Sequence, residues 1–143
     1  LPPWWVFVLS PPVHLDTGDA YCHLSAARAT QPPPTRARAD SASLRVLEAV
    51  QRGDYAATLA ALTNDFEPLV AAAYAPVAAA LRALRAAGAE HAMLSGSGGA
   101  TFALCANENA ARALAAALAP LPEARTFVVP FAADESWRAP SAA

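Results

Sequence analysis

The sequence predicts an α+β fold, in which helices pack on one face of an antiparallel four-stranded sheet. Four short apolar runs indicate strands, at residues 5–9, 91–94, 101–105 and 125–129. Segments with apolar residues at helical spacing separate the first two runs and the last two, whereas only a glycine-rich loop separates the middle pair. Two right-handed crossovers around a central hairpin then give the split β-α-β, or ferredoxin-like, arrangement.

The first apolar run combines aromatic and branched residues and ends at Pro11, which is typical of a buried strand. After it, Asp16 and Thr17 offer an N-cap oxygen to a short helix over residues 18–27. Three consecutive prolines follow, and each proline removes a backbone donor and restricts the residue before it. We therefore expect residues 29–40 to form an exposed loop.

The middle of the chain predicts a series of helices. Ser41 or Ser43 can cap the first of them, and Asp54 begins the second. Asp65 is predicted to cap the third, which places Pro68 in the first turn, where its missing N–H costs nothing. A proline eight residues further on interrupts or kinks this third helix.

The end of the chain predicts a helix and a strand after the central hairpin. Asn107 can cap the helix, and Pro120 ends it before the last apolar run. We expect residues 1–131 to form one domain and residues 132–143 a loose tail. The chain opens without an initiator methionine, so we also expect it to be a piece of a longer protein.

The composition argues against several classes of protein. The net charge of −2 and the pI of about 5.9 give no electrostatic reason to expect nucleic acid or an anionic membrane as partner. All 10 basic residues are arginine, which excludes lysine-dependent chemistry within this chain. The longest uncharged apolar stretch, residues 69–81, is too short to span a bilayer. Cys22 and Cys105 lie far apart, so we expect no disulfide framework, no zinc site and a reducing cytoplasm.

The loop Ser95-Gly96-Ser97-Gly98-Gly99 is the most informative local feature. Glycines let a backbone approach a ligand closely and point several N–H groups at an anion, for which phosphate is the natural candidate. The P-loop requires a lysine that is absent here, and a dinucleotide loop opens a helix, whereas a strand follows this loop. A flexible hairpin turn that binds nothing is the alternative.

Three stretches resemble known kinases. Residues 94–104, LSGSGGATFAL, resemble the third signature motif of the GHMP kinases, which include galactokinases and the homoserine, mevalonate and phosphomevalonate kinases. Residues 10–21, SPPVHLDTGDAY, are similar to a strand-to-helix passage of the family that acts on 4-diphosphocytidyl-2-C-methyl-D-erythritol, and residues 64–68, NDFEP, to its Asn-Asp-hydrophobic-Glu segment. Together with the order of elements, the resemblance extends from about residue 4 to about residue 130.

The resemblance implies the C-terminal domain of an ATP- and Mg²⁺-dependent phosphotransferase. The enzyme would phosphorylate a hydroxyl of the methylerythritol moiety in non-mevalonate isoprenoid biosynthesis. In this family the main ATP-binding loop, the lysine and aspartate near the acceptor hydroxyl and the magnesium-holding residues belong to an N-terminal domain that has no counterpart here. We therefore assign no catalytic residue to this chain and expect it to be inactive alone, with the missing domain as its partner and some self-association through the exposed interface.

Two alternatives remain open at this point. One is another GHMP kinase, with homoserine, mevalonate or phosphomevalonate as acceptor. The other is a ferredoxin-like domain that binds a ligand or a partner protein without catalysis, because this architecture serves many functions.

The candidate site residues carry different expectations. The loop from Ser95 to Gly99 should shape the phosphate and acceptor region through backbone N–H groups, with Ser97 as a candidate hydroxyl contact. Thr17 contacts substrate if its family position holds, although a helix cap explains a threonine in this place with no ligand at all. Asn64 and Asp65 are either ligands or a turn and cap that brace the loop. No metal site is predicted.

Overall fold

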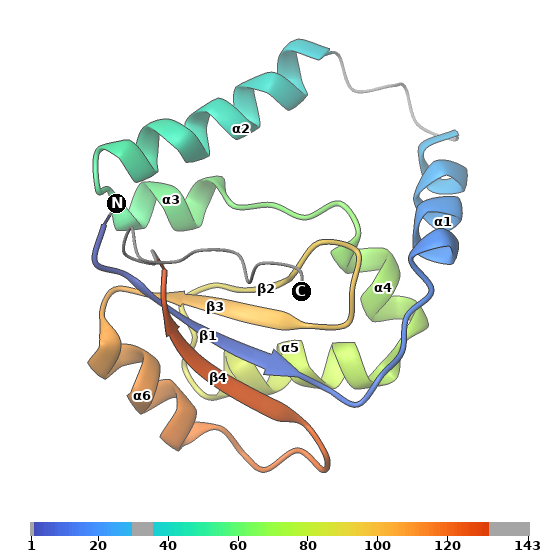
Figure 1. Cartoon of the computed structure of the whole chain (residues 1–143). Helices are drawn as coiled ribbons and strands as arrows, with labels where there is room; N and C mark the ends of the chain where they lie inside the picture. Colours follow the sequence, from blue (N-terminus) through green and yellow to red (C-terminus); the bar gives the residue numbers. More distant parts are fainter. Residues whose placement is uncertain (1, 30–35, 132–143) are drawn as a thin grey trace, which may run out of the picture.

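The chain forms one antiparallel sheet covered by helices (Figure 1). A computed structural model describes residues 2–29 and 36–131. The sheet contains β1 (Trp5–Ser10), β2 (Ala92–Leu94), β3 (Thr101–Cys105) and β4 (Arg125–Pro130) in the order β2-β3-β1-β4. All neighbouring strands are antiparallel, and β2 and β3 form the predicted hairpin. The α+β prediction is confirmed, and the strand order agrees with a split β-α-β arrangement.

Six helices occur among the described residues. Five of them connect β1 to β2, and one connects β3 to β4. Their bounds are α1 (Thr17–Ala29), α2 (Arg36–Gln51), α3 (Tyr55–Ala61), α4 (Glu67–Ala73), α5 (Ala75–Ala86) and α6 (Glu108–Ala117).

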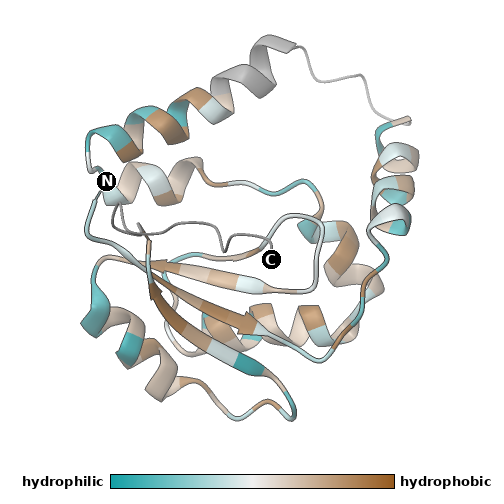
Figure 2. Ribbon diagram, in the orientation of Figure 1, coloured by the Kyte–Doolittle hydropathy of each residue, from teal (hydrophilic) through white to brown (hydrophobic). Residues whose placement is uncertain are grey.

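The core lies between the sheet and the helices α4, α5 and α6. Phe7 and Leu9 of β1 are fully buried, and they share one face of the sheet because side chains alternate along a strand. Leu84 of α5 and Leu114 of α6 pack in the same apolar cluster. Figure 2 shows the apolar colouring concentrated along the strands. Burial of these side chains fixes the ends of the strands that carry the candidate site.

The helix α2 begins earlier than predicted. Residues 36–40 were expected to belong to an exposed loop, but the helix begins at Arg36, before either predicted serine cap. Arginine and alanine are good helix formers, and a proline restricts its predecessor more than the residues after it. The expected loop is therefore wrong for this part, while residues 30–35 and the predicted tail lie outside the described residues.

The break between α4 and α5 lies at Tyr74, two residues before Pro76, where the sequence predicted an interruption. This proline lies in the first turn of α5, and the two helices are bent by 117°. No single helix in the ranges 2–29 and 36–131 has the length and apolar character to cross a membrane; α4 and α5 meet those criteria only as this bent pair.

A partly buried tyrosine connects α3 to the sheet. The ring of Tyr55 lies edge-on to Trp4, with centroids 5.6 Å apart, and its hydroxyl donates a hydrogen bond of 2.8 Å to the carbonyl of Leu104. Burial raises the pKa of Tyr55 to about 12, and the charges of Glu90 and Cys105 add to the effect. The neutral phenol is thus the form that the folded protein favours.

The Tyr55→Phe variant is expected to lose about 1 kcal/mol of unfolding free energy near neutral pH, the net value of one hydrogen bond. The folded pKa of about 12 exceeds the unfolded value of 10.0, so the stability contributed by the phenol is complete below pH 10 and is lost as pH rises through 12. Urea unfolding of both proteins across this range should show the difference shrinking. A difference that stays constant would contradict the assignment.

Candidate functional site

The glycine loop connects β2 to β3 at the end of the sheet where β1 also ends. Its base is closed by a hydrogen bond of 2.8 Å from the N–H of Ser95 to the carbonyl of Ala100. Inside the loop, the N–H of Gly98 donates to the carbonyl of Ser95 at 3.3 Å. Gly96 has a φ of 59°, a left-handed conformation that glycine adopts without strain. The hairpin turn is therefore tight and internally bonded.

Three loop N–H groups are left without a partner. Within residues 2–29 and 36–131, the N–H groups of Gly96, Ser97 and Gly99 donate no hydrogen bond. Gly96 is exposed, and Ser97 and Gly99 are half-buried. The N–H groups of Ser95 and Gly98 are used inside the turn, which leaves those of Gly96, Ser97 and Gly99 as the candidate donors of the predicted loop. Unpaired N–H groups gathered in one turn, such as the successive pair at Gly96 and Ser97, suit an anionic oxygen.

The loop packs directly against the passage between β1 and α1. A Cβ atom built on Gly99 would lie 2.7 Å from Cγ1 of Val13 and 2.9 Å from Cδ1 of Leu15. Real Cβ contacts essentially never come this close, so Gly99 is the residue that permits the approach. The second resembling stretch, residues 10–21, is thereby placed against the first.

Asn64 connects the third stretch to the same loop. Its side-chain amide donates hydrogen bonds of 2.8 Å to the carbonyls of Leu94 and Gly96. Its Oδ1 accepts a bond of 2.8 Å from the N–H of Phe66, which fixes the side chain at the start of α4. The side-chain NH2 group of Asn64 thus donates both of its hydrogens to backbone carbonyls of β2 and the loop. This geometry favours the bracing alternative for Asn64 over a direct ligand contact.

Asp65 and Thr17 make no hydrogen bond to the loop within the described ranges. The predicted cap role of Asp65 is wrong, because the N-cap of α4 is Phe66 and no side chain caps it, although the predicted Pro68 does lie in the first turn. Asp65 instead forms an exposed ion pair with Arg28 of α1.

Thr17 is the exposed first residue of α1 and makes no capping bond there among the described contacts. The side chain of Asp16 supplies the N-terminal acceptor, at 2.7 Å from the N–H of Gly18. Asp16 and Thr17 were the two predicted cap residues, and the side chain that accepts the bond in the structure is that of Asp16.

Glu67 is a further residue at the site that the sequence reasoning did not single out. It is the first residue of α4, and its Oε2 accepts a hydrogen bond of 2.8 Å from the N–H of Leu94. Its Oε1 lies 2.9 Å from Nη2 of Arg85. Its membership of the resembling segment 64–68 was a sequence signal that could have marked Glu67 as a site residue. Its partners Leu94 and Arg85 lie far along the chain, so the sequence alone does not show the contacts.

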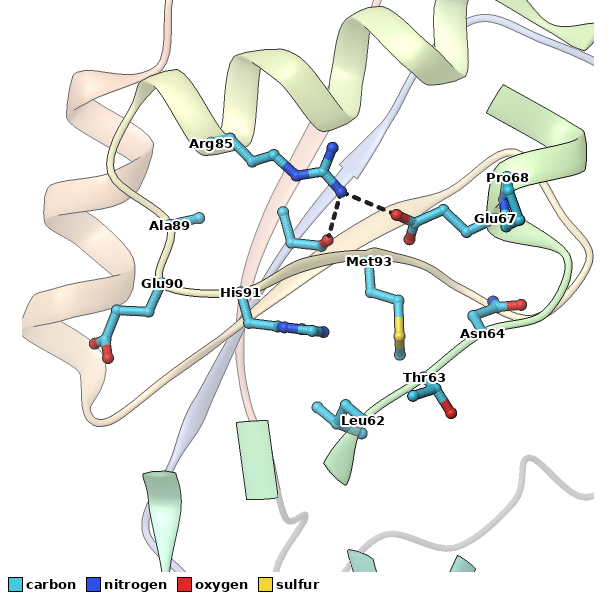
Figure 3. Close-up of a pocket in the computed structure, with 11 residues that line it drawn as sticks. Leu62, Thr63, Asn64, Glu67, Pro68, Arg85, Ala89, Glu90, His91 and Met93 are labelled. Atoms are coloured by element: carbon cyan, nitrogen blue, oxygen red, sulfur yellow. Dashed lines mark hydrogen bonds and ion pairs between the residues drawn. The ribbon is translucent and has the colours of Figure 1, made fainter. Parts of the chain in front are cut away.

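A pocket of about 390 Å³ runs along the outer edge of β2 (Figure 3). It shares Asn64 and Glu67 with the loop support, but none of residues 95–99 lines it. His91 also lines the pocket, and its buried Nε2 has no hydrogen-bond partner in the described part of the chain. The same part of the chain contains no group of three or more His, Cys, Asp or Glu side chains that could hold a metal.

The fold and the loop define a class of protein: an α+β domain that presents unpaired backbone N–H groups at one end of an antiparallel sheet. A family model described as "GHMP kinases C terminal" matches residues 46–121, which is more than half of the 143 residues. The chain therefore belongs to the family of GHMP kinase C-terminal domains.

Relatives in sequence include bacterial kinases. The chain is similar to the 4-diphosphocytidyl-2-C-methyl-D-erythritol kinase of Moorella thermoacetica, with 35% identity over 118 residues, 82% of this chain and 40% of that protein. The enzyme of the same name from Heliobacterium modesticaldum is 33% identical over 125 residues, 82% of this chain and 39% of that protein. The chain thus spans about two-fifths of the length of these relatives.

Two solved structures share the fold. L. major mevalonate kinase, in complex with R-mevalonate, superposes with a TM-score of 0.67 at 22% identity, covering 93% of this chain and 45% of that one. Homoserine kinase from Cytophaga hutchinsonii gives a TM-score of 0.58 at 21% identity, covering 91% and 44%. At these identities the likeness establishes the fold alone.

Proposed function

We propose that this chain is the C-terminal domain of a 4-diphosphocytidyl-2-C-methyl-D-erythritol kinase, an enzyme of non-mevalonate isoprenoid biosynthesis. In this proposal the whole protein transfers the γ-phosphoryl group of ATP to a hydroxyl of the methylerythritol moiety. Family membership supports the kinase class, and the relatives at 35% and 33% identity support this acceptor over homoserine or mevalonate. We also propose a cytoplasmic location, where ATP and a charged acceptor are both available.

One structural observation carries the proposal. The three stretches that resemble the family lie far apart in sequence, yet they meet at one end of the sheet. Gly99 of the stretch 94–104 packs on Val13 of the stretch 10–21, and Asn64 of the stretch 64–68 bonds to Gly96. A ligand-free hairpin turn would need no such convergence. The arrangement supports a surface that faces phosphate groups.

The loop would act by stabilising charge. Phosphoryl transfer spreads negative charge over the transferring group, and catalysis depends on positioned donors and cations that neutralise it. The unpaired N–H groups of Gly96, Ser97 and Gly99 are fixed donors that need no reorganisation when the charge develops. The Ser97 hydroxyl is a candidate additional contact.

The remaining catalytic parts would come from the N-terminal domain. The described residues offer no cluster of oxygen ligands suited to Mg²⁺, and we assign no step to a metal held by this chain. The chain contains no lysine to pair with phosphates. We therefore expect the domain alone to be inactive. Large apolar side chains exposed on and after β4, Phe127 and Phe131, are consistent with a prediction of self-association.

The test is an acceptor panel with the whole kinase that contains this chain. With ATP and Mg²⁺, we expect phosphorylation of 4-diphosphocytidyl-2-C-methyl-D-erythritol, with kcat/KM well above the values for homoserine, mevalonate and phosphomevalonate. The isolated chain, assayed in parallel, should give no transfer above background. Preference for another acceptor would assign the chain to a different kinase of the family, and turnover by the isolated chain would contradict the absence of catalytic groups.

A further inference from the structure

The strand β2 lies at an edge of the sheet, so one side of its backbone has no neighbouring strand. Unpaired edge groups are normally covered or left to solvent. Here side chains cover them: the N–H of Leu94 donates to Oε2 of Glu67, and its carbonyl accepts from Asn64, both at 2.8 Å. Nη2 of Arg85 lies 3.4 Å from the carbonyl of Ala92. Three side chains thus occupy the place of a fifth strand along β2.

Glu67 is the central member of this group. Its side chain is 21% exposed, whereas the side chain of Arg85 is 54% exposed. One carboxylate oxygen pairs with the guanidinium and the other accepts from Leu94, so the two contacts fix the orientation of the carboxylate. Figure 3 shows Glu67 and Arg85 facing each other across the outer side of β2. A hydrogen bond to a charged acceptor is stronger than one between neutral groups.

Leu94 is the last residue of β2 and immediately precedes the glycine loop. We propose that Glu67 is a positioning residue of the kinase, which holds the N–H of Leu94 and thereby sets the direction in which the loop amides face. This inference rests on the proposed function, because it assigns a purpose to the loop that Glu67 supports. Glu67 itself touches no substrate in this proposal; it acts through Leu94.

A purely structural role for the ion pair makes different predictions. If the pair with Arg85 only stabilised the fold, Glu67→Ala and Arg85→Met would have equal effects, since each removes the pair. If Glu67 acts through Leu94, Arg85→Met should be milder, because the carboxylate can still accept from the N–H. Glu67→Gln should restore most of the lost activity, since its amide oxygen can accept the same bond.

The experiment measures kcat and KM of the whole kinase and three variants, Glu67→Ala, Glu67→Gln and Arg85→Met, well below their melting temperatures. Glu108→Ala is the matched control: Glu108 pairs with Arg112 at 2.6 Å on α6 and contacts no part of the loop. We expect Glu67→Ala to lower kcat by about 10- to 100-fold with little change in the KM for the acceptor. The control should match the wild type.

A second readout is independent of activity. Hydrogen exchange of the Leu94 amide and of the segment 95–101 in the whole kinase should accelerate in Glu67→Ala and remain slow in Glu108→Ala. Unchanged exchange, or equal kcat losses in Glu67→Ala and Arg85→Met, would overturn the positioning role while leaving the proposed function intact. A third outcome is that exchange accelerates in Glu67→Ala while the wild-type protein phosphorylates none of the acceptors. That result would refute the proposed function but would still support the contact between Glu67 and the N–H of Leu94.

Discussion

Replacing Gly99 with alanine in the whole kinase is expected to lower kcat by about 100-fold, because a displacement of the order of 1 Å in a catalytic loop has an effect of that size. The new Cβ would lie 2.7 Å from Cγ1 of Val13 and 2.9 Å from Cδ1 of Leu15. Val13 is branched at Cβ and has little rotamer freedom, so the loop must move instead. Overpacking of this kind also costs about 1–3 kcal/mol of stability.

Gly98→Ala is the control for this prediction. A Cβ at Gly98 would meet only the carbonyl oxygen of Ser95, at 3.8 Å, which is an ordinary van der Waals contact. Steady-state assays of both variants beside the wild type should therefore show a large loss for Gly99→Ala and near-normal kcat for Gly98→Ala. Equal kcat values for the two variants would show that the approach of the loop to Val13 has no importance for activity.

Asn64→Ala is expected to lower the unfolding free energy by about 2–3 kcal/mol. Three hydrogen bonds are lost, two to the carbonyls of Leu94 and Gly96 and one from the N–H of Phe66, and each contributes about 1 kcal/mol net. Because the lost bonds brace the loop, kcat should fall together with stability. Urea unfolding of the chain and kinetic assays of the whole kinase measure the two effects.

Asp65→Ala is the neighbouring control for Asn64→Ala. Its ion pair with Arg28 is exposed, with side chains 64% and 49% accessible, and such pairs contribute less than about 1 kcal/mol. The two variants should thus differ clearly in unfolding free energy although the residues are adjacent. A loss for Asp65→Ala as large as that for Asn64→Ala would mean that the brace runs through α1 and not through the loop carbonyls.

The strands and the central hairpin could be predicted because their signals are local. Each strand is an apolar run, and the glycines between residues 94 and 101 mark the turn directly. The cap of α6 by Asn107 was predicted for the same reason: its Oδ1 accepts from the N–H of Ala110, three residues away. Contacts within one turn leave a pattern in the sequence.

Long-range partners explain what the sequence did not reveal. Asn64 and Asp65 were treated as one pair, but their partners, Gly96 and Arg28, lie 32 and 37 residues away in opposite directions. Nothing in the neighbouring sequence distinguishes Asn64, which braces the loop, from Asp65, which forms the ion pair. Glu67 was missed as a site residue because its partner Leu94 is 27 residues away.

The early start of α2 was missed for a different reason. The three prolines dominated the local signal, whereas the residues from Arg36 onward have good helix propensity. Likewise, the number of loop N–H groups available to a ligand depends on which of them the turn itself uses. That depends on backbone geometry, such as the φ of 59° at Gly96, which composition does not specify.

The most direct test is a crystal structure of the whole kinase with a non-hydrolysable ATP analogue and the cytidine-diphosphate-linked acceptor bound. We expect phosphate oxygens of the ligands within about 3.2 Å of the backbone nitrogens of Gly96, Ser97 or Gly99. A complex in which these three N–H groups face away from both ligands would contradict the claim that the loop is a phosphate-facing surface.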